Sequence, residues 1–123
     1  MKFAKYTFLS AAVYGFLVLI PQYFLETKNG TDFPPAITHP EYYYGFVGVA
    51  LAFQVVFLII SKNPLQYRAM MIPSVIEKFS FVLALIVLFI QQRVAPAMMF
   101  FGGIDLLLGI FFIVSYFKTS KTE

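Results

Sequence analysis

Cysteine and tryptophan are absent from this chain of 123 residues, and histidine occurs once, as His39. Without cysteine, disulfides, thiol nucleophiles, iron–sulfur ligation and the thiol-exchange chemistry of four-helix enzymes like vitamin K epoxide reductase are all excluded. A single histidine leaves almost no ligands for a tetrahedral zinc site within one chain. We therefore expect neither a metal nor any other cofactor.

Charged residues are also scarce, at 12% of the chain, whereas soluble domains average about 25%. Hydrophobic residues make up 60% and aromatic residues 20%, which predicts a protein of the lipid bilayer. The net charge of +3 comes from lysines and arginines scattered at segment ends. These basic residues do not form the continuous stripe that is typical of nucleic-acid-binding proteins. We therefore expect membrane lipid as a partner and no nucleic acid.

Four apolar windows fill most of the chain, and each is long enough to span a bilayer as a helix of about 20 residues. The windows are 7–25, 42–61, about 71–90 and 97–117, with an outer loop at 26–40. We predict a single transmembrane domain over 1–123, with an all-α fold: a membrane-spanning four-helix bundle of antiparallel up-down topology. The first window follows two lysines like a signal peptide, but it lacks the small-x-small cleavage pattern, so we expect it to be retained.

The basic residues indicate the orientation of the four spans. If the spans alternate, six basic residues fall on one side and only Lys28 and Arg93 on the other. The six are Lys2, Lys5, Lys62, Arg68, Lys118 and Lys121. The positive-inside rule then predicts a multi-pass protein of the cell inner membrane with both termini in the cytoplasm.

Helix boundaries are indicated by capping and proline patterns. Thr38 and Glu41 form a capping-box pattern around Pro40, which predicts the start of the second helix there. The short connection at Asn63-Pro64 predicts that the second and third helices are antiparallel neighbours. Pro73 is expected to kink the third helix near the inner boundary. In the outer loop, Asn29-Gly30-Thr31 is formally a glycosylation sequon, although Asn-Gly is also typical of a turn.

Three charged residues and one glutamine lie well inside the predicted spans: Glu77, Lys78, Asp105 and Gln54. At 1.5 Å per helical residue, their depths allow them to meet in one layer. The helical stripe through Glu77 carries the smallest and most polar residues of its span, so Glu77 should face the bundle interior. That stripe also contains Ser74, Ser80, Ala84 and Gln91. Lys78 is about 100° away, and we expect it to extend toward the cytoplasmic interface.

Small residues predict where helices approach each other closely. Asp105 shares a stripe with Gly102 and Gly109, so it should also face inward. On the second helix, the face of Gly45, Gly48 and Ala52 is predicted to be a packing surface, distinct from the stripe of Gln54. The two faces are expected to contact different neighbours.

The buried carboxylates need partners, because an Asp at a helix centre costs about 2.5 to 3.5 kcal/mol on insertion. One lysine neutralises at most one of them. The other must be protonated, reached by water, or hydrogen-bonded to Gln54, Ser80 or Tyr14. Two hypotheses follow and both stay open: the acids line a ligand or proton site, or they form a structural clasp between the third and fourth helices.

His39 and Glu41 lie at the predicted outer mouth of the bundle. They have the chemistry for acid–base work, but a helix-capping role is the favoured explanation. No catalytic residue is assigned from the sequence.

Three segments carry a resemblance to small uncharacterised bacterial four-helix membrane proteins. They are 39–46 (HPEYYYGF), the Pro73-x3-Glu77-Lys78 element and 102–109 (GGIDLLLG). The resemblance covers residues 39–117, and more remotely the plan is similar to the DoxX-like superfamily. It implies a four-helix fold and a bacterial inner-membrane location, and it implies no activity.

The leading functional hypothesis is non-enzymatic: an accessory subunit, or a bundle that binds a lipid or other hydrophobic ligand next to its buried carboxylates. A protein partner or a homo-oligomer is compatible with it. The alternative is a small intramembrane enzyme that transfers protons, like the sterol-isomerase group, although the chain lacks tryptophan and has one peripheral histidine. A proton-coupled exporter resembling the small multidrug resistance family ranks last, because that family's key carboxylate is on its first helix and a dual-topology dimer would need a weak charge bias.

Overall fold

The computed structural model describes residues 2–120, and these residues form helices and connections with no strand. The predicted all-α fold is therefore confirmed. The elements are α1 (Lys2–Leu19), η1 (Ile20–Phe24), α2 (Glu26–Asp32), α3 (Pro40–Lys62), η2 (Arg68–Met70), α4 (Met71–Ile90) and α5 (Met98–Ser120). Lys121, counted above with the basic residues, lies outside the described part of the chain.

Four stretches of the described chain are long and apolar enough to cross a membrane. They are Lys2–Phe24, Pro40–Lys62, Arg68–Ile90 and Met98–Thr119. Their length and composition mark the chain as a multi-pass membrane protein. Each agrees with a window predicted from hydropathy to within three residues at both ends, apart from the first, which begins five residues earlier.

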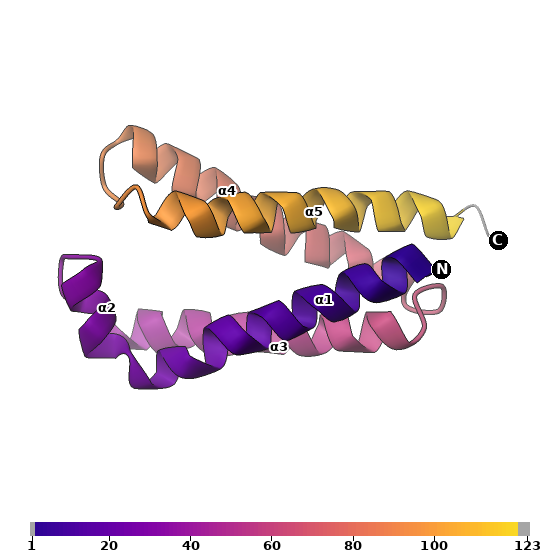
Figure 1. Ribbon diagram of the computed structural model, residues 1–123, viewed down its shortest axis with the longest axis horizontal. Coiled ribbons are helices and arrows are strands. Elements are labelled where there is room, and N and C mark those ends of the chain that lie inside the picture. Colours follow the sequence, from indigo (N-terminus) through magenta and orange to yellow (C-terminus); the bar gives the residue numbers. More distant parts are fainter. Residues whose placement is uncertain (1, 121–123) are drawn as a thin grey trace.

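The helices form two antiparallel pairs, α1 with α3 and α4 with α5, and α1 also packs against α5 (Figure 1). Both ends of the described chain lie at one end of the bundle, together with the α3–α4 connection. The opposite end, which we call the distal end, carries α2 and the α4–α5 connection. The up-down topology is as predicted, but α3 and α4 are not close neighbours along their length, because each packs mainly against another helix.

The main hydrophobic core lies toward the end that carries the termini. Its centre is formed by Phe8, Phe57 and Phe112, from three different helices, and all three rings are fully buried. Phe8 stacks on Phe112 with 4.1 Å between ring centroids, and Phe57 meets Phe112 edge-on at 5.0 Å. Aromatic pairs of this kind contribute about 0.5 to 1.5 kcal/mol beyond their area burial. This cluster fixes α1, α3 and α5 together at one end of the bundle.

Small residues decide which helices pair. On α1, Ala11 and Gly15 are buried four residues apart, which lets α3 approach closely. On α5, Gly102 and Gly109 are buried against α4, as predicted. The predicted packing face of Gly45, Gly48 and Ala52 is wrong, because Gly45 and Ala52 are exposed and Gly45 has no neighbouring atom within 4 Å of an added Cβ. The stripe of Gln54 with Ala50 and Ser61 is buried in its place.

Two predictions about helix ends are also wrong. The N-cap of α3 is His39, whose carbonyl accepts the first helical hydrogen bonds, and no side chain caps the helix. Thr38 is one residue too early for a capping box, although Pro40 occupies the first turn as expected. Pro73 lies in the first turn of α4, where its missing N–H needs no partner, so it does not interrupt a helix.

The predicted outer loop contains the short helix α2. Asn29, Gly30 and Thr31 are helical, so the turn interpretation of Asn-Gly is wrong. Acidic Glu26 stands in the first turn of α2, where it favours a helix. Lys28 bonds Asp32 at 2.9 Å one turn later. These local contacts, together with the hydrogen bonds of Asn29 described below, order this segment.

Candidate functional site

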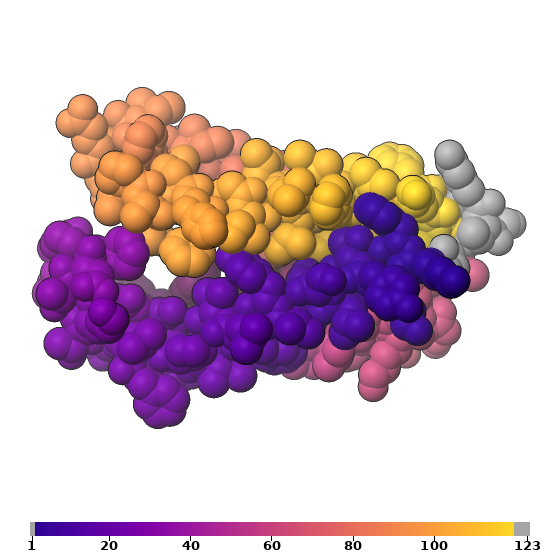
Figure 2. Space-filling view, in the orientation of Figure 1, coloured from indigo at the N-terminus to yellow at the C-terminus, as the bar shows by residue number. Residues whose placement is uncertain are grey.

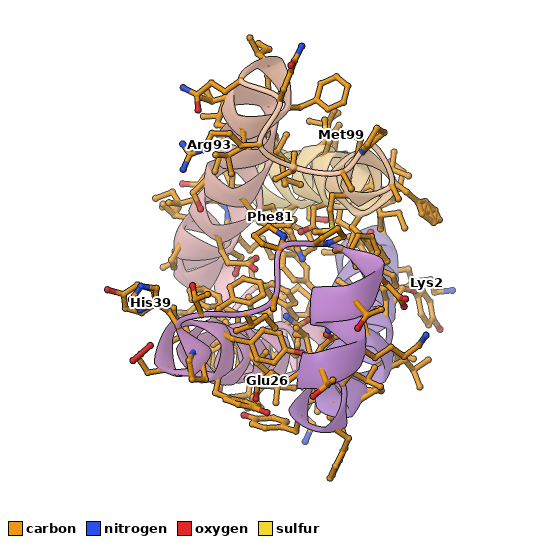
Figure 3. All side chains as sticks on the ribbon, turned by 90° about the vertical axis from the view of Figure 1, so that its left-hand side faces the viewer. Lys2, Glu26, His39, Phe81, Arg93 and Met99 are labelled. Atoms are coloured by element: carbon orange, nitrogen blue, oxygen red, sulfur yellow. The ribbon has the colours of Figure 1, made fainter. Side chains whose placement is uncertain are left out.

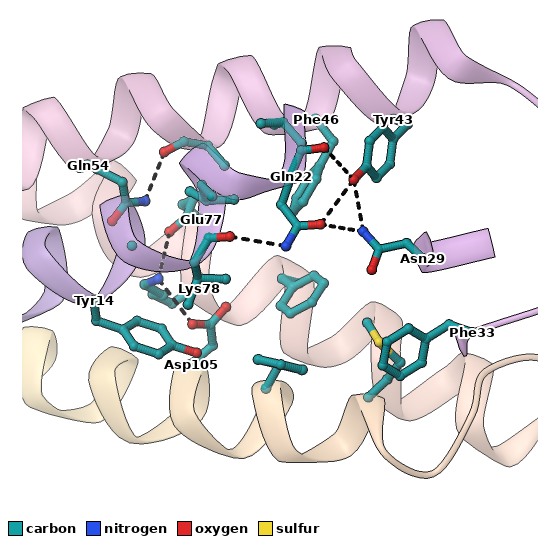
Figure 4. A pocket seen from close by; sticks show the side chains of 18 of the residues that line it. Tyr14, Gln22, Asn29, Phe33, Tyr43, Phe46, Gln54, Glu77, Lys78 and Asp105 are labelled. Carbon is teal, nitrogen blue, oxygen red and sulfur yellow. Dashed lines mark hydrogen bonds and ion pairs between the residues drawn. The ribbon is translucent and has the colours of Figure 1, made fainter. Parts of the chain in front are cut away.

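The two helix pairs diverge toward the distal end, and a cavity of about 400 Å³ lies between them. Figure 2 shows the surface hollowed between the purple segment around α1 and α2 and the orange start of α5. All four long helices, α2 and the α2–α3 connection contribute to the lining. Polar side chains gather at two places, one near the middle of the bundle and one at the distal end (Figure 4).

Lys78, Glu77 and Asp105 form a charged triad near the middle of the bundle. The Lys78 ammonium donates a hydrogen bond to Asp105 Oδ1 at 3.1 Å and lies 3.7 Å from Glu77 Oε2. The first contact ties α4 to α5, so the predicted clasp geometry is present. One ammonium faces two carboxylates, and only Asp105 receives a hydrogen bond from it.

The expectation that Lys78 extends toward the interface is wrong. Lys78 is 4% exposed and faces the interior of the bundle. The buried face of α4 is Met71, Ser74, Lys78, Val82 and Leu85, a stripe at helical spacing. A lysine is tolerated there because two carboxylates share its charge and the Phe57 ring lies 5.4 Å from its ammonium.

The predicted interior stripe of α4 holds only in part. Ser74 is buried and Glu77 is partly buried, but Ser80, Ala84 and Gln91 are exposed. The Ser80 hydroxyl donates to the carbonyl of Glu77 at 3.0 Å and takes no part in the cavity. Ser80 is therefore removed from the candidate site.

Gly109 brings the triad together. A Cβ added to Gly109 would lie 3.3 Å from Lys78 Cβ and 2.8 Å from the Phe79 ring. The absence of a side chain at this position lets α4 approach α5 closely enough for Lys78 to reach Asp105, one turn away on the same face of α5.

Gln54 lies on the cavity wall and is 2% exposed. Its amide nitrogen donates to the Ala50 carbonyl at 2.8 Å, while its amide oxygen has no hydrogen-bond partner. The side chain packs on Gly15 of α1, where any Cβ would collide with it. Gln54 therefore fits only because residue 15 is a glycine, and this contact was not evident in the sequence.

Tyr14 of α1 also lines the cavity, with its phenol directed toward Asp105 in Figure 4. The structure thus brings together five of the predicted site residues: Tyr14, Gln54, Glu77, Lys78 and Asp105. The predicted common layer of polar groups is present. These residues come from all four long helices, so the site depends on the whole bundle.

A second polar cluster, which the sequence analysis did not assign, consists of Gln22, Asn29 and Tyr43. The Tyr43 hydroxyl bonds the Gln22 carbonyl at 2.8 Å and receives a hydrogen bond from the Asn29 amide at 2.9 Å. The Asn29 amide also bonds the Gln22 side chain. This distal cluster ties α2 to α3 beside the cavity (Figure 4). In the sequence, this cluster was indicated by Gln22, a polar residue near the end of an apolar span.

The walls between the two polar clusters are apolar. They include Val18, Phe46, Val47, Phe81, Met98 and Phe101. Phe46 of α3 and Phe81 of α4 face each other with 6.2 Å between ring centroids. The cavity therefore offers hydrophobic contact along its length and polar contact at its ends.

His39 and Glu41 lie outside the lining of the cavity. The His39 ring points away from the bundle in Figure 3, stacks on Tyr42 and lies 3.3 Å from Glu41. Both side chains are exposed. Within residues 2–120, no group of three His, Asp or Glu side chains is arranged to hold a metal ion.

Comparison of the chain with protein-family models, with curated proteins and with solved structures gave no match.

Proposed function

We propose that this protein binds a lipid or another hydrophobic molecule between its helices, in the cavity of the distal half. The observation that carries the proposal is the cavity itself, with apolar walls and a charged triad at one end. Its volume falls in the range of about 300 to 1,000 Å³ that is typical of small-molecule sites. Convergent polar groups in an otherwise apolar pocket are the usual means of orienting a ligand.

The position of the hollow supports entry of the ligand from the side. Near the termini, α1 and α5 are in contact through Phe3 with Phe111 and Phe8 with Phe112. Toward the distal end the two helices separate, and the surface is hollowed between them (Figure 2). A molecule dissolved in the bilayer would reach the apolar walls there without crossing a polar surface.

We further propose a location in the bacterial inner membrane with both termini in the cytoplasm, in a four-helix protein similar in plan to the DoxX-like superfamily. The excess of lysine and arginine at the end that carries the termini supports this orientation. The distal end, with α2 and the cavity mouth, would then face the opposite side of the membrane. A protein partner or a second copy of the chain is compatible with this arrangement.

Native mass spectrometry of the protein in a gentle detergent tests the proposed function. The wild-type protein should retain a small hydrophobic molecule or lipid. Ala50→Phe fills the cavity wall and should abolish the adduct, whereas Ala52→Phe, on the exposed face of the same helix, should leave it. An adduct that survives Ala50→Phe, or a wild-type protein that retains no small molecule, would contradict the proposal.

A further inference from the structure

We propose that the ligand is an amphiphile with a protonated amine head group, held at the triad of Glu77, Lys78 and Asp105. This inference rests on the proposed function, because it assigns a ligand class to the same cavity. It follows from three observations: the charge balance of the triad, the side chains that face the cavity, and the hydrogen-bond acceptors left without donors.

The triad contains one ammonium and two carboxylates, a formal charge of −1. No other Lys or Arg side chain lines the cavity in the described chain. An uncompensated charge in an apolar environment is expensive, and a bound cation removes that cost. A bound alcohol leaves the negative charge in place, and a bound anion adds to it.

All three side chains line the cavity, and the two carboxylates are more exposed than the ammonium. The Lys78 side chain is 5% exposed, compared with 21% for Glu77 and 15% for Asp105. Both acids line the cavity at this level. A head group that approaches along the apolar walls is therefore more accessible to the two acids than to the buried lysine. The same surface repels fatty acids and phosphate head groups.

Two buried oxygens of cavity-lining side chains lack hydrogen-bond donors: Glu77 Oε2, which lies beside Lys78, and Gln54 Oε1, which lies against Gly15 of α1. Lys78 directs its hydrogen bond to Asp105 and stays 3.7 Å from Glu77 Oε2. Unpaired buried acceptors favour a ligand that carries N–H groups. A primary ammonium supplies positive charge and three such donors, whereas a quaternary ammonium supplies the charge alone and an alcohol supplies a single neutral donor.

The aromatic walls suit such a molecule. Phe46, Phe81 and Phe101 line the cavity beyond the triad and offer contact to an alkyl or aryl tail. Their ring faces also attract a cation that passes over them. The site thus combines a cation-selective end with hydrophobic walls, which is the chemistry that an amine-headed amphiphile matches.

Three probes with the same alkyl tail separate the contributions: dodecylamine, dodecyltrimethylammonium and dodecanol. Each is titrated at neutral pH into wild type, Glu77→Gln and Ala50→Phe in a neutral detergent, and the bound fraction is measured by native mass spectrometry. Wild type should bind dodecylamine at least about tenfold more tightly than either other probe, because a hydrogen bond to a charged group outweighs a neutral one. Glu77→Gln keeps the size of the side chain and should remove this preference.

The outcomes distinguish the two proposals. If dodecanol binds wild type as tightly as dodecylamine, and both are lost in Ala50→Phe, the ligand class is wrong and the binding function stands. If Glu77→Gln retains the preference for dodecylamine, the assignment to Glu77 is wrong. If binding of all three probes is unchanged in Ala50→Phe, the cavity is not the binding site and both proposals fail.

Discussion

At the scale of single residues, Lys78 is the centre of the site. It is the most buried of the three charged groups, and within the described triad it is the only cation beside two carboxylates on different helices. Removal of one partner from a buried ion pair leaves the other charge uncompensated, which typically costs about 3 to 5 kcal/mol. The stability of the bundle should therefore depend more on Lys78 than on either acid.

Lys78→Met should lower the free energy of unfolding by about 3 to 5 kcal/mol, because both carboxylates lose their counter-charge. The matched control is Glu77→Gln, which should change the free energy of unfolding by about 1 kcal/mol or less in either direction, since Glu77 receives no hydrogen bond from Lys78. Denaturant unfolding in detergent micelles measures both variants. A larger loss for Glu77→Gln than for Lys78→Met would show that the charge distribution of the triad has been assigned wrongly.

The sequence identifies the triad but not its geometry. Gln54, Glu77, Lys78 and Asp105 stand out because polar residues are rare in spans of this hydropathy. Lys78 was predicted on the wrong face because a comparison of helical stripes weighs the size and polarity of one helix alone. Its burial is decided by Asp105 on another helix. The distal cluster was missed for the same reason, since Asn29 and Tyr43 meet only in the folded chain.

At the scale of helices, the contacts of α1 with α3 depend on a glycine. Gly15→Ala should destabilise the protein by about 1 to 3 kcal/mol, the usual cost of overpacking, because the new methyl group collides with Gln54. The same substitution made in a Gln54→Ala background should cost less than about 1 kcal/mol. Gly45→Ala serves as the control, since its methyl group meets open space.

Thermal unfolding of these four variants, followed by circular dichroism, measures the coupling between positions 15 and 54. Equal costs for Gly15→Ala with and without Gln54 would mean that the two residues are not in contact.

The packing of α4 on α5 can be tested in the same way with two glycines of α5. Gly109→Ala should separate α4 from α5 and lengthen the Lys78–Asp105 contact, because its methyl group meets Phe79 and Lys78 Cβ. Gly103→Ala, two turns away on the exposed side, meets no neighbour and should be neutral. A loss of about 1 to 3 kcal/mol is expected for Gly109→Ala in the same unfolding assay. Similar stabilities for the two variants would contradict the packing of α4 on Gly109.

At the scale of the whole molecule, hydropathy and length were sufficient to predict four spans and an up-down arrangement. The pairing of the helices was not predictable from loop length, because the short connection at 63–67 leads from α3 to η2 and α4 although α3 and α4 pack mainly elsewhere, whereas α1 and α3 pair across the much longer segment 20–39. The pairing follows from where small residues allow close approach. The cavity exists because the aromatic core joins the helices near the termini while the two pairs diverge at the distal end.

The proposed orientation can be tested directly because the chain has no native cysteine. Thr31→Cys in α2 and Asn63→Cys in the α3–α4 connection both introduce an exposed thiol. With the termini in the cytoplasm, a membrane-impermeant maleimide should label position 31 in intact spheroplasts and position 63 only after permeabilisation. The reverse pattern would place the termini outside, and the positive-inside argument would fail.

The central claim, that the distal cavity holds a hydrophobic molecule, is tested most directly by fluorescence, because the chain also lacks tryptophan. Phe81→Trp places a single reporter in the cavity wall, and Phe100→Trp places one on the exposed surface of α5. Titration with a brominated alkylamine should quench position 81 saturably and position 100 only in proportion to concentration, and Ala50→Phe should abolish the saturable part. Quenching at position 81 that never saturates, or that is unchanged by Ala50→Phe, would contradict the claim.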